Sequence, residues 1–185
     1  MDNVSAELTS STITVFTVNK NWADKAIAQL SDSQIHIALD PETNSVAVIM
    51  KHIAGNLKSR WTDFLVDDGE KPWRDRDDEF VDTFSDRQEL LDYWEEGWKC
   101  LFDSLYQLQA GDLGRTVHIR GEPHSVPLAI QRNLGHTCYH VGQILMVARI
   151  LVGDDWETIT IARGGSKTHN QNAWAKDDYR SRKDT

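Results

Sequence analysis

Two of the seven histidines stand four residues apart, as His136 and His140 in the segment Gly-His-Thr-Cys-Tyr-His. If this segment is helical, both imidazoles project from one face about one turn apart, and this spacing can chelate a metal ion. Seven histidines in 185 residues give about a one-in-four chance that some such pair arises at random. The pair alone is therefore a weak signal, and the ordinary alternative for each residue is a hydrogen-bonded interior or surface histidine.

The surroundings of the pair strengthen the metal interpretation. It lies beside an apolar stripe and not on it, in line with Asn133 and Gln143, so polar side chains would point together at one edge. His52 occupies a matching position in another predicted helix, and a third imidazole from a facing helix would complete a ligand set. We therefore predict a divalent metal site formed by His52, His136 and His140.

The predicted ligands are all neutral, and this limits the chemistry they could support. Three imidazoles leave the charge of the ion uncancelled and coordination positions open, which lowers the pKa of a bound thiol or water. The donor set suits zinc or nickel first, with iron or manganese as alternatives. Three polar residues about one turn from the ligands are predicted to contact substrate: Asn56 and Gln143 by orienting it or a bound water, and Arg132 by holding a carboxylate.

The other histidines have simpler interpretations. His118 and His124 fall in a predicted hairpin and His169 in a polar tail, where solvated or turn roles are expected. The charged run from Asp75 to Glu79 is expected to be a solvated loop without a function.

Three segments have the three- and four-residue apolar spacing of amphipathic helices: 45–66, 86–108 and 125–151. Thr43 or Asn44 can cap the first, and Asp86 with Glu89 has the pattern of a capping box at the start of the second. Pro127 suits the first turn of the third, and Gly153 can end it. The stripe of the second helix includes Trp94 and Trp98, which we expect to pack in the core.

The segment from Thr12 to Val18 is β-branched and alternating, which locally favours a strand. It has no strand partner, so we predict a first helix over about 6–30. Residues 67–85 carry many charges and are expected to form a surface loop, and residues 116–126 are expected to form a short hairpin around Gly121-Glu122. The predicted fold class is therefore all-α, a four-helix bundle with a short β-hairpin between the third and fourth helices.

Composition bounds the remaining possibilities. A chain of 185 residues suits one domain, here with a polar tail from about residue 165. Its 29 acidic and 20 basic side chains give a net charge of -9, which disfavours nucleic acid and anionic membranes as partners. No apolar run approaches a membrane span and no signal-peptide pattern is present, so we expect a cytoplasmic protein. Cys100 and Cys138 have no disulfide spacing and are expected to be reduced, partly buried thiols.

Several segments of the chain resemble one known family. The likeness runs from about residue 44 to 170 and includes NSVAVIMKHIAGNLKSRWTDFL, DGEKPWRDRDDEF, ELLDYWEEGWKCLF, DLGRTVHIRGEPHSV, NLGHTCYHVGQI and DWETITIARGGSK. In these stretches the chain is similar to the DinB-like (DinB/YfiT-like) superfamily of metal-dependent proteins, in particular to a bacterial subfamily of unknown function. It departs from that subfamily near residues 162–165, and the first predicted helix matches it loosely.

The resemblance implies an up-and-down four-helix bundle, commonly a homodimer, with one metal-binding histidine from the second helix and an HxxxH pair from the last. These positions are His52, His136 and His140 here. Members of the superfamily include thiol-dependent S-transferases and an isomerase, so the resemblance implies a small-molecule thiol as a partner. The candidate functions are a metal-dependent transferase or hydrolase, a non-catalytic metal- or ligand-binding dimer, and a bundle whose histidines merely pack.

Overall fold

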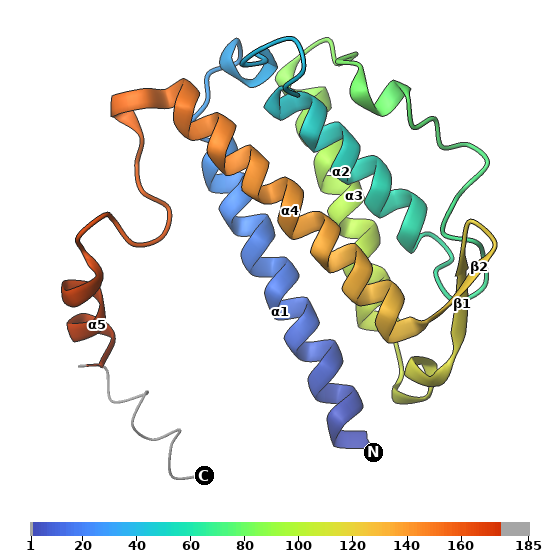
Figure 1. Cartoon of the computed structure of the whole chain (residues 1–185). Helices are drawn as coiled ribbons and strands as arrows, with labels where there is room; N and C mark the ends of the chain where they lie inside the picture. The colour runs from blue at the N-terminus through green and yellow to red at the C-terminus, as the bar shows by residue number, and fades with distance from the viewer. Residues whose placement is uncertain (1, 175–185) are drawn as a thin grey trace. The chain divides into compact units, whose positions relative to one another are not determined.

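The computed structural model describes residues 2–174, and these fall into two units, one ending at Asp154 and one beginning at Asp155. The first unit is mostly helical and carries a two-stranded antiparallel sheet. Its long helices lie side by side, with the hairpin at one end (Figure 1). Its main elements are α1 (Asp2–Ile27), α2 (Val46–Trp61), α3 (Arg87–Gln107), β1 (Thr116–Ile119), β2 (Glu122–Ser125) and α4 (Val126–Val152).

Helix α1 forms from the segment whose side chains locally favour a strand, so the predicted first helix is confirmed. Thr14 and Thr17 each donate their hydroxyl to the carbonyl four residues back, which satisfies these groups inside a helix. Phe16 is fully buried and meets Trp61 and Trp98 edge-on, with ring centroids 6.4 and 6.3 Å apart. Packing of this face overrides the local preference.

Helix α2 is buried along almost its whole length. Ser45 caps it with its side chain, and not Thr43 or Asn44 as predicted. The helix ends at Trp61, earlier than predicted, because Asp63 adopts a left-handed backbone conformation with φ of 51°. Since neighbours cover α2 from several directions, it also carries buried polar residues, namely Lys51, His52, Asn56 and Ser59.

Helix α3 follows its predicted stripe. Asp86 caps it by accepting the Glu89 N–H at 2.9 Å, but the Glu89 carboxylate accepts from the N–H and hydroxyl of Ser85 and not from Asp86. At Gly97 the helix approaches α2 so closely that a Cβ would lie 2.7 Å from the Ala54 Cα. The stripe is buried as expected and consists of Leu90, Trp94, Trp98, Leu101 and Leu105.

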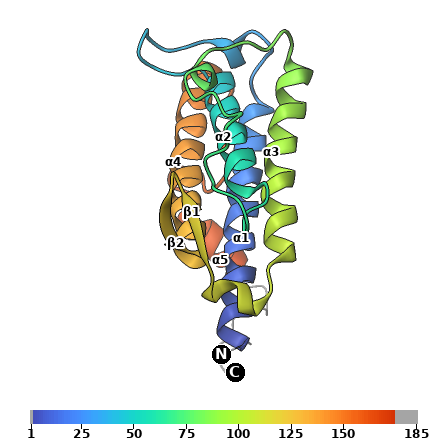
Figure 2. The same cartoon turned by 90° about the vertical axis from the view of Figure 1, so that its right-hand side faces the viewer.

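Helices α2 and α3 run in the same direction. Lys58 pairs with Glu96 at 3.0 Å, and Ser104 donates to the carbonyl of Trp61 at 2.7 Å. Residue numbers thus increase in the same direction along both helices. Figures 1 and 2 show α1 and α4 running the other way. The expected up-and-down order is therefore wrong. The connection 62–86 makes the parallel arrangement possible, because it is long enough to return along α2, a helix of 16 residues and about 24 Å.

The predicted hairpin is confirmed, although its turn lies at Arg120-Gly121 and not at Gly121-Glu122, because Glu122 already pairs with Ile119. The hairpin is hydrogen-bonded to the 62–86 connection. Arg120 and Gly121 form its turn with positive φ values of 57° and 74°, as a tight two-residue turn requires. The Asp68 carboxylate accepts the N–H of both residues at 2.8 and 2.7 Å. Gly69 donates its N–H to the carbonyl of His118 at 2.8 Å. The hairpin and the first part of the connection therefore pack together beside the C-terminal end of α2 and the N-terminal part of α4.

Helix α4 begins and ends close to the predicted positions. The Ser125 hydroxyl caps its first turn by accepting the Leu128 N–H at 3.3 Å, and Pro127 lies in that turn. Gly153 ends the helix with φ of 66°, a conformation that favours glycine. None of the described helices has the length and apolar character that crossing a bilayer would need.

The second unit contains α5 (Ser166–Trp174), a helix that the sequence did not predict within the polar tail. His169 lies in it and is exposed. Residues 175–185, the rest of the predicted tail, lie outside the described residues.

Candidate metal centre

Three histidines from two helices meet inside the first unit. His52 comes from α2, and His136 and His140 come from successive turns of α4. One ring nitrogen of each lies within 4.8 Å of the others, and the ring centroids are 4.5 to 5.1 Å apart. Within residues 2–174, this is the one group of three or more His, Cys or carboxylate side chains with ligand atoms so close together. The structure thus brings together the three predicted ligands.

Glu79, in the 62–86 connection, holds the His52 ring. Its Oε2 lies 2.9 Å from His52 Nδ1, and Arg74 donates to both carboxylate oxygens at 2.7 and 2.8 Å. Phe80 stacks on the imidazole with ring centroids 4.8 Å apart. Burial raises the pKa of Glu79, but hydrogen bonds from His52 and Arg74 outweigh it and bring the pKa below its usual value. An ionised acceptor places the His52 proton on Nδ1 and leaves the Nε2 lone pair free.

Two residues of α2 bring Glu79 to this position. The buried ammonium of Lys51 donates to the carbonyls of Asp78 and Val81 at 2.7 and 3.0 Å, and to the Asp78 carboxylate at 2.8 Å. Gly55 leaves space for the Glu79 carboxylate, because a Cβ there would overlap its Oε1 and lie 3.0 Å from its Cδ. Lys51 therefore anchors the chain before and after Glu79, and Gly55 leaves room for its carboxylate.

The two α4 histidines are held differently. Gln143 Oε1 lies 2.7 Å from His140 Nδ1, and Gln143 Nε2 donates to the Tyr139 hydroxyl at 3.1 Å. This arrangement assigns the proton of His140 to Nδ1. The buried Nδ1 of His136 has no partner among the described residues. Burial, and then the neighbouring His140 and His52, lower the pKa of His136 to about 3, so its ring is neutral at physiological pH.

These features fit a divalent ion. Nitrogens about 2.1 Å from one ion, at angles of about 90–109°, lie about 3.0–3.4 Å apart. The Nε2 atoms of His52 and His136 are 3.1 Å apart, within that range. Two lone pairs at this distance repel each other unless a proton or a cation lies between them. A proton on His136 can make the same contact in the metal-free protein, so metal binding itself is the deciding measurement.

The three predicted substrate contacts have different surroundings. Gln143 touches a predicted ligand directly. Asn56 is buried and accepts from Asn133 Nδ2 at 2.7 Å. Arg132 is exposed and donates to His124 Nε2 at 2.9 Å, and His124 Nδ1 lies 2.9 Å from the carbonyl of Glu122, a contact within the hairpin that fits the predicted turn role. Asn56 and Arg132 nevertheless line the same small cavity beside the cluster.

The sequence did not indicate that Glu79 and Arg74 belong to the site, because the run from Asp75 to Glu79 was expected to be a solvated loop. That expectation is wrong for Glu79, which is 4% exposed, and the Arg74 side chain just before the run is 1% exposed. An irregular connection has no apolar period, and Glu79 stands 27 positions from His52, so spacing could not link them. The apolar pair Phe80-Val81 that follows the charged run gives no such signal either, because these side chains are themselves 47% and 54% exposed.

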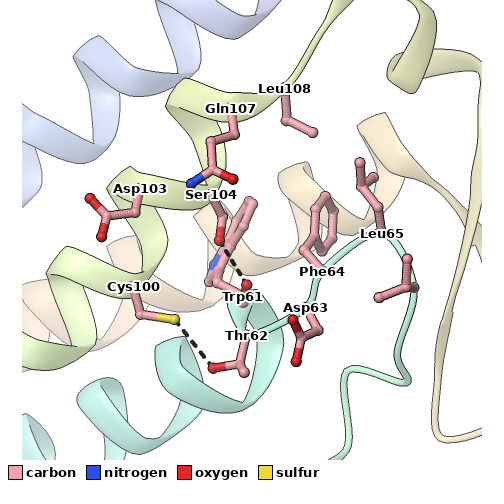
Figure 3. A pocket seen from close by; sticks show the side chains of 11 residues that line it. Trp61, Thr62, Asp63, Phe64, Leu65, Cys100, Asp103, Ser104, Gln107 and Leu108 are labelled. Atoms are coloured by element: carbon pink, nitrogen blue, oxygen red, sulfur yellow. Dashed lines mark hydrogen bonds between the residues drawn. The ribbon is translucent and has the colours of Figure 1, made fainter.

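A larger cavity, of about 450 Å³, lies where α2 and α3 end (Figure 3). Its lining includes Trp61, Cys100 and Ser104, and it holds no cluster of potential metal ligands. Cys100 and Thr62 share a hydrogen bond of 3.4 Å. Cys100 and Cys138 are both free, half-buried thiols, as expected. Volume by itself does not make a chemical site, so the histidine cluster is the candidate centre.

Comparisons with known proteins bear on the fold and the family. The crystal structure of a conserved protein from Enterococcus faecalis is similar, with a TM-score of 0.54 and 16% sequence identity over 83% of this chain and 98% of that chain. At this identity the likeness shows a shared fold alone. No curated protein matches the chain. A family model described as a protein of unknown function (DUF1572) matches residues 3–165. The chain therefore belongs to the DUF1572 family of proteins of unknown function.

Proposed function

We propose that this protein binds one divalent metal ion through His52, His136 and His140. The observation that carries the proposal is the convergence of three imidazoles, two of which have their Nδ1 atoms engaged by Glu79 and Gln143. Such contacts fix the tautomer and orientation of histidine ligands and leave Nε2 for the ion. Zinc or nickel suits the donor set first, and iron or manganese are the alternatives.

Metal content and thermal stability test this proposal. Protein purified without added metal should contain about one ion per chain by elemental analysis. Zinc or nickel added to chelator-treated protein should raise its melting temperature, because an ion bound only by the folded state stabilises that state by mass action. Absence of metal together with an unchanged melting temperature would refute the proposal.

The resemblance to the DinB-like superfamily supports a finer proposal, a metal-dependent S-transferase that uses a small-molecule thiol, or a hydrolase. When bound, the ion would lower the pKa of a coordinated thiol or water. Gln143, next to His140, and Asn56, in the adjoining cavity, would orient the bound molecule. A panel of thiols and electrophiles assayed with defined metals should reveal turnover that His140→Ala abolishes.

The alternative is a non-catalytic metal- or ligand-binding protein, and one observation favours it. Glu79 is the carboxylate that contacts the cluster, and both of its oxygens are engaged by His52 and Arg74. It is therefore not free to act as a general base. Tight metal binding without turnover across the same panel would support this alternative.

We also infer that the four long helices form a four-helix bundle with α2 and α3 parallel, and that two chains associate as a homodimer in the cytoplasm. Exposed apolar side chains on α1 and α4 support the association, because a partner would remove them from water. Light scattering showing a monomer at tens of micromolar would contradict it. The exposed side chains are Val15, Val18, Leu128, Tyr139, Met146 and Ile150.

A further inference from the structure

A small cavity of about 130 Å³ opens beside the histidine cluster. His136 forms part of its wall. The cavity volume is about the volume that four water molecules occupy in the liquid. The cavity therefore suits one carboxylate or phosphate group, and it is smaller than the pockets of about 300 Å³ or more that hold whole ligands. Four arginines from different segments line it: Arg60 on α2, Arg76 in the 62–86 connection, Arg120 in the hairpin turn and Arg132 on α4.

The positive charge of this wall is only partly balanced. The Glu70 carboxylate interacts with three of the arginines. It accepts two hydrogen bonds from Arg76 at 2.7 and 2.5 Å, and it lies 3.5 Å from both Arg60 and Arg120. The Asp68 carboxylate is occupied by backbone N–H groups of the hairpin turn. One carboxylate shared by three guanidinium groups leaves hydrogen-bond donors available for another anion.

Arg132 adds a further positive charge. It donates to His124, and in the described part of the chain no carboxylate pairs with it. Two carboxylates, Glu70 and Asp68, interact with this set of four guanidinium groups, and a third, Glu79, which also attracts Arg76, is already paired with Arg74. Burial, and then the neighbouring Arg74, lower the pKa of Arg60 to about 10, consistent with a cation short of counter-charge. A cleft lined by one sign of charge concentrates ligands of the opposite sign.

We propose that this cavity binds an oxyanion group, a carboxylate or a phosphate, which belongs to the small molecule bound at the metal centre. The planar guanidinium groups can donate in pairs to either group. A molecule held at this end would extend past His136 towards the histidine cluster. The inference rests on the proposed metal site for its functional meaning, although the arginines are not themselves metal ligands.

Calorimetric titration of the metal-loaded protein with succinate and, separately, with inorganic phosphate tests the proposal. Low ionic strength is required because salt screens such contacts. We expect saturable binding of at least one probe, and the tighter probe identifies carboxylate or phosphate as the preferred group. Arg132→Gln and Arg120→Gln should each weaken this binding about tenfold. The control Arg115→Gln removes a guanidinium outside the cavity, paired with Asp112 at 3.0 Å, and should bind as the wild type does.

A metal-free arm separates this inference from the proposed function. His140→Ala should lose the metal but retain arginine-dependent binding of the probe. Three outcomes would overturn the inference. They are no probe binding to the metal-loaded wild type, loss of probe binding together with the metal, and unchanged probe binding in both arginine variants. Arginine-dependent binding in a wild-type chain that never takes up metal would refute the proposed metal function alone. Circular dichroism of each variant distinguishes lost binding from lost fold.

Discussion

The α2 side and the α4 side of the histidine cluster are held by different means. On the α2 side, His52 is 7% exposed and contacts a buried carboxylate, Glu79, that Arg74 clamps. On the α4 side, His140 is half-buried and contacts Gln143, a neutral neighbour on the same helix. Charge-assisted hydrogen bonds away from water are stronger than neutral ones near it. The α2 side is therefore the more rigid support, and the α4 side is the more open one.

The difference also separates long-range from local support. Glu79 reaches His52 only because the 62–86 connection folds back along α2, whereas Gln143 reaches His140 through the helix period. Variants that act on one side should therefore have unequal effects, and the inequality can be measured.

Removal of any ligand should abolish the site whichever side it belongs to, and this is the largest effect. His52→Ala, His136→Ala and His140→Ala should each lose tight metal binding in calorimetry, while the helical content stays near wild type. The control variants His118→Ala and His124→Ala should keep the metal. If His124→Ala removed the metal and His52→Ala retained it, the ligand assignment would be wrong.

Glu79→Gln should weaken metal binding by about 10–100-fold, because it retains the size of the side chain but removes the charge that orients His52. It should also lower the melting temperature, since the buried Arg74 loses its counter-charge. The matched control is Glu89→Gln, which changes an exposed carboxylate at the start of α3. Equal metal affinities in the two variants would argue against a supporting role for Glu79.

Gly55→Ala should weaken metal binding by up to about tenfold without altering a ligand, because the added Cβ displaces the Glu79 carboxylate. The control Gly142→Ala places a methyl group on an exposed part of α4, where no heavy atom lies within 4 Å. It should retain the affinity and stabilise the protein by up to about 1 kcal/mol through helix propensity. Parallel metal titrations and thermal melts provide both comparisons, and an unchanged affinity in Gly55→Ala would contradict the packing explanation.

Gln143→Ala should have the smallest effect on the metal, a loss of about threefold or less, because water can replace the amide as partner of the half-exposed His140. Turnover, if the protein is an enzyme, should fall more than affinity does. A loss of affinity as large as that of Glu79→Gln would remove the distinction between the two sides.

The sequence by itself determined the local features of this protein. The Asp86 cap and the apolar stripe of α3, the hairpin turn at Gly121, and the shared helical face of His136 and His140 were all predictable. Each depends on residues within one or two turns of one another, where the period of the backbone decides which side chains meet. Tertiary packing overrode local propensity in α1, but the lack of a strand partner made that outcome predictable too.

Only the tertiary structure decided which supports surround the histidines. The parallel course of α2 and α3, the contact of Glu79 with His52 and the arginine-lined cavity all depend on the 62–86 connection and where it packs. An irregular connection has no period from which burial can be inferred, and its charged side chains look solvated until their partners are known. Arg74 and Glu79 are buried because each neutralises the other beside His52, and that pairing exists only once the chain has folded back.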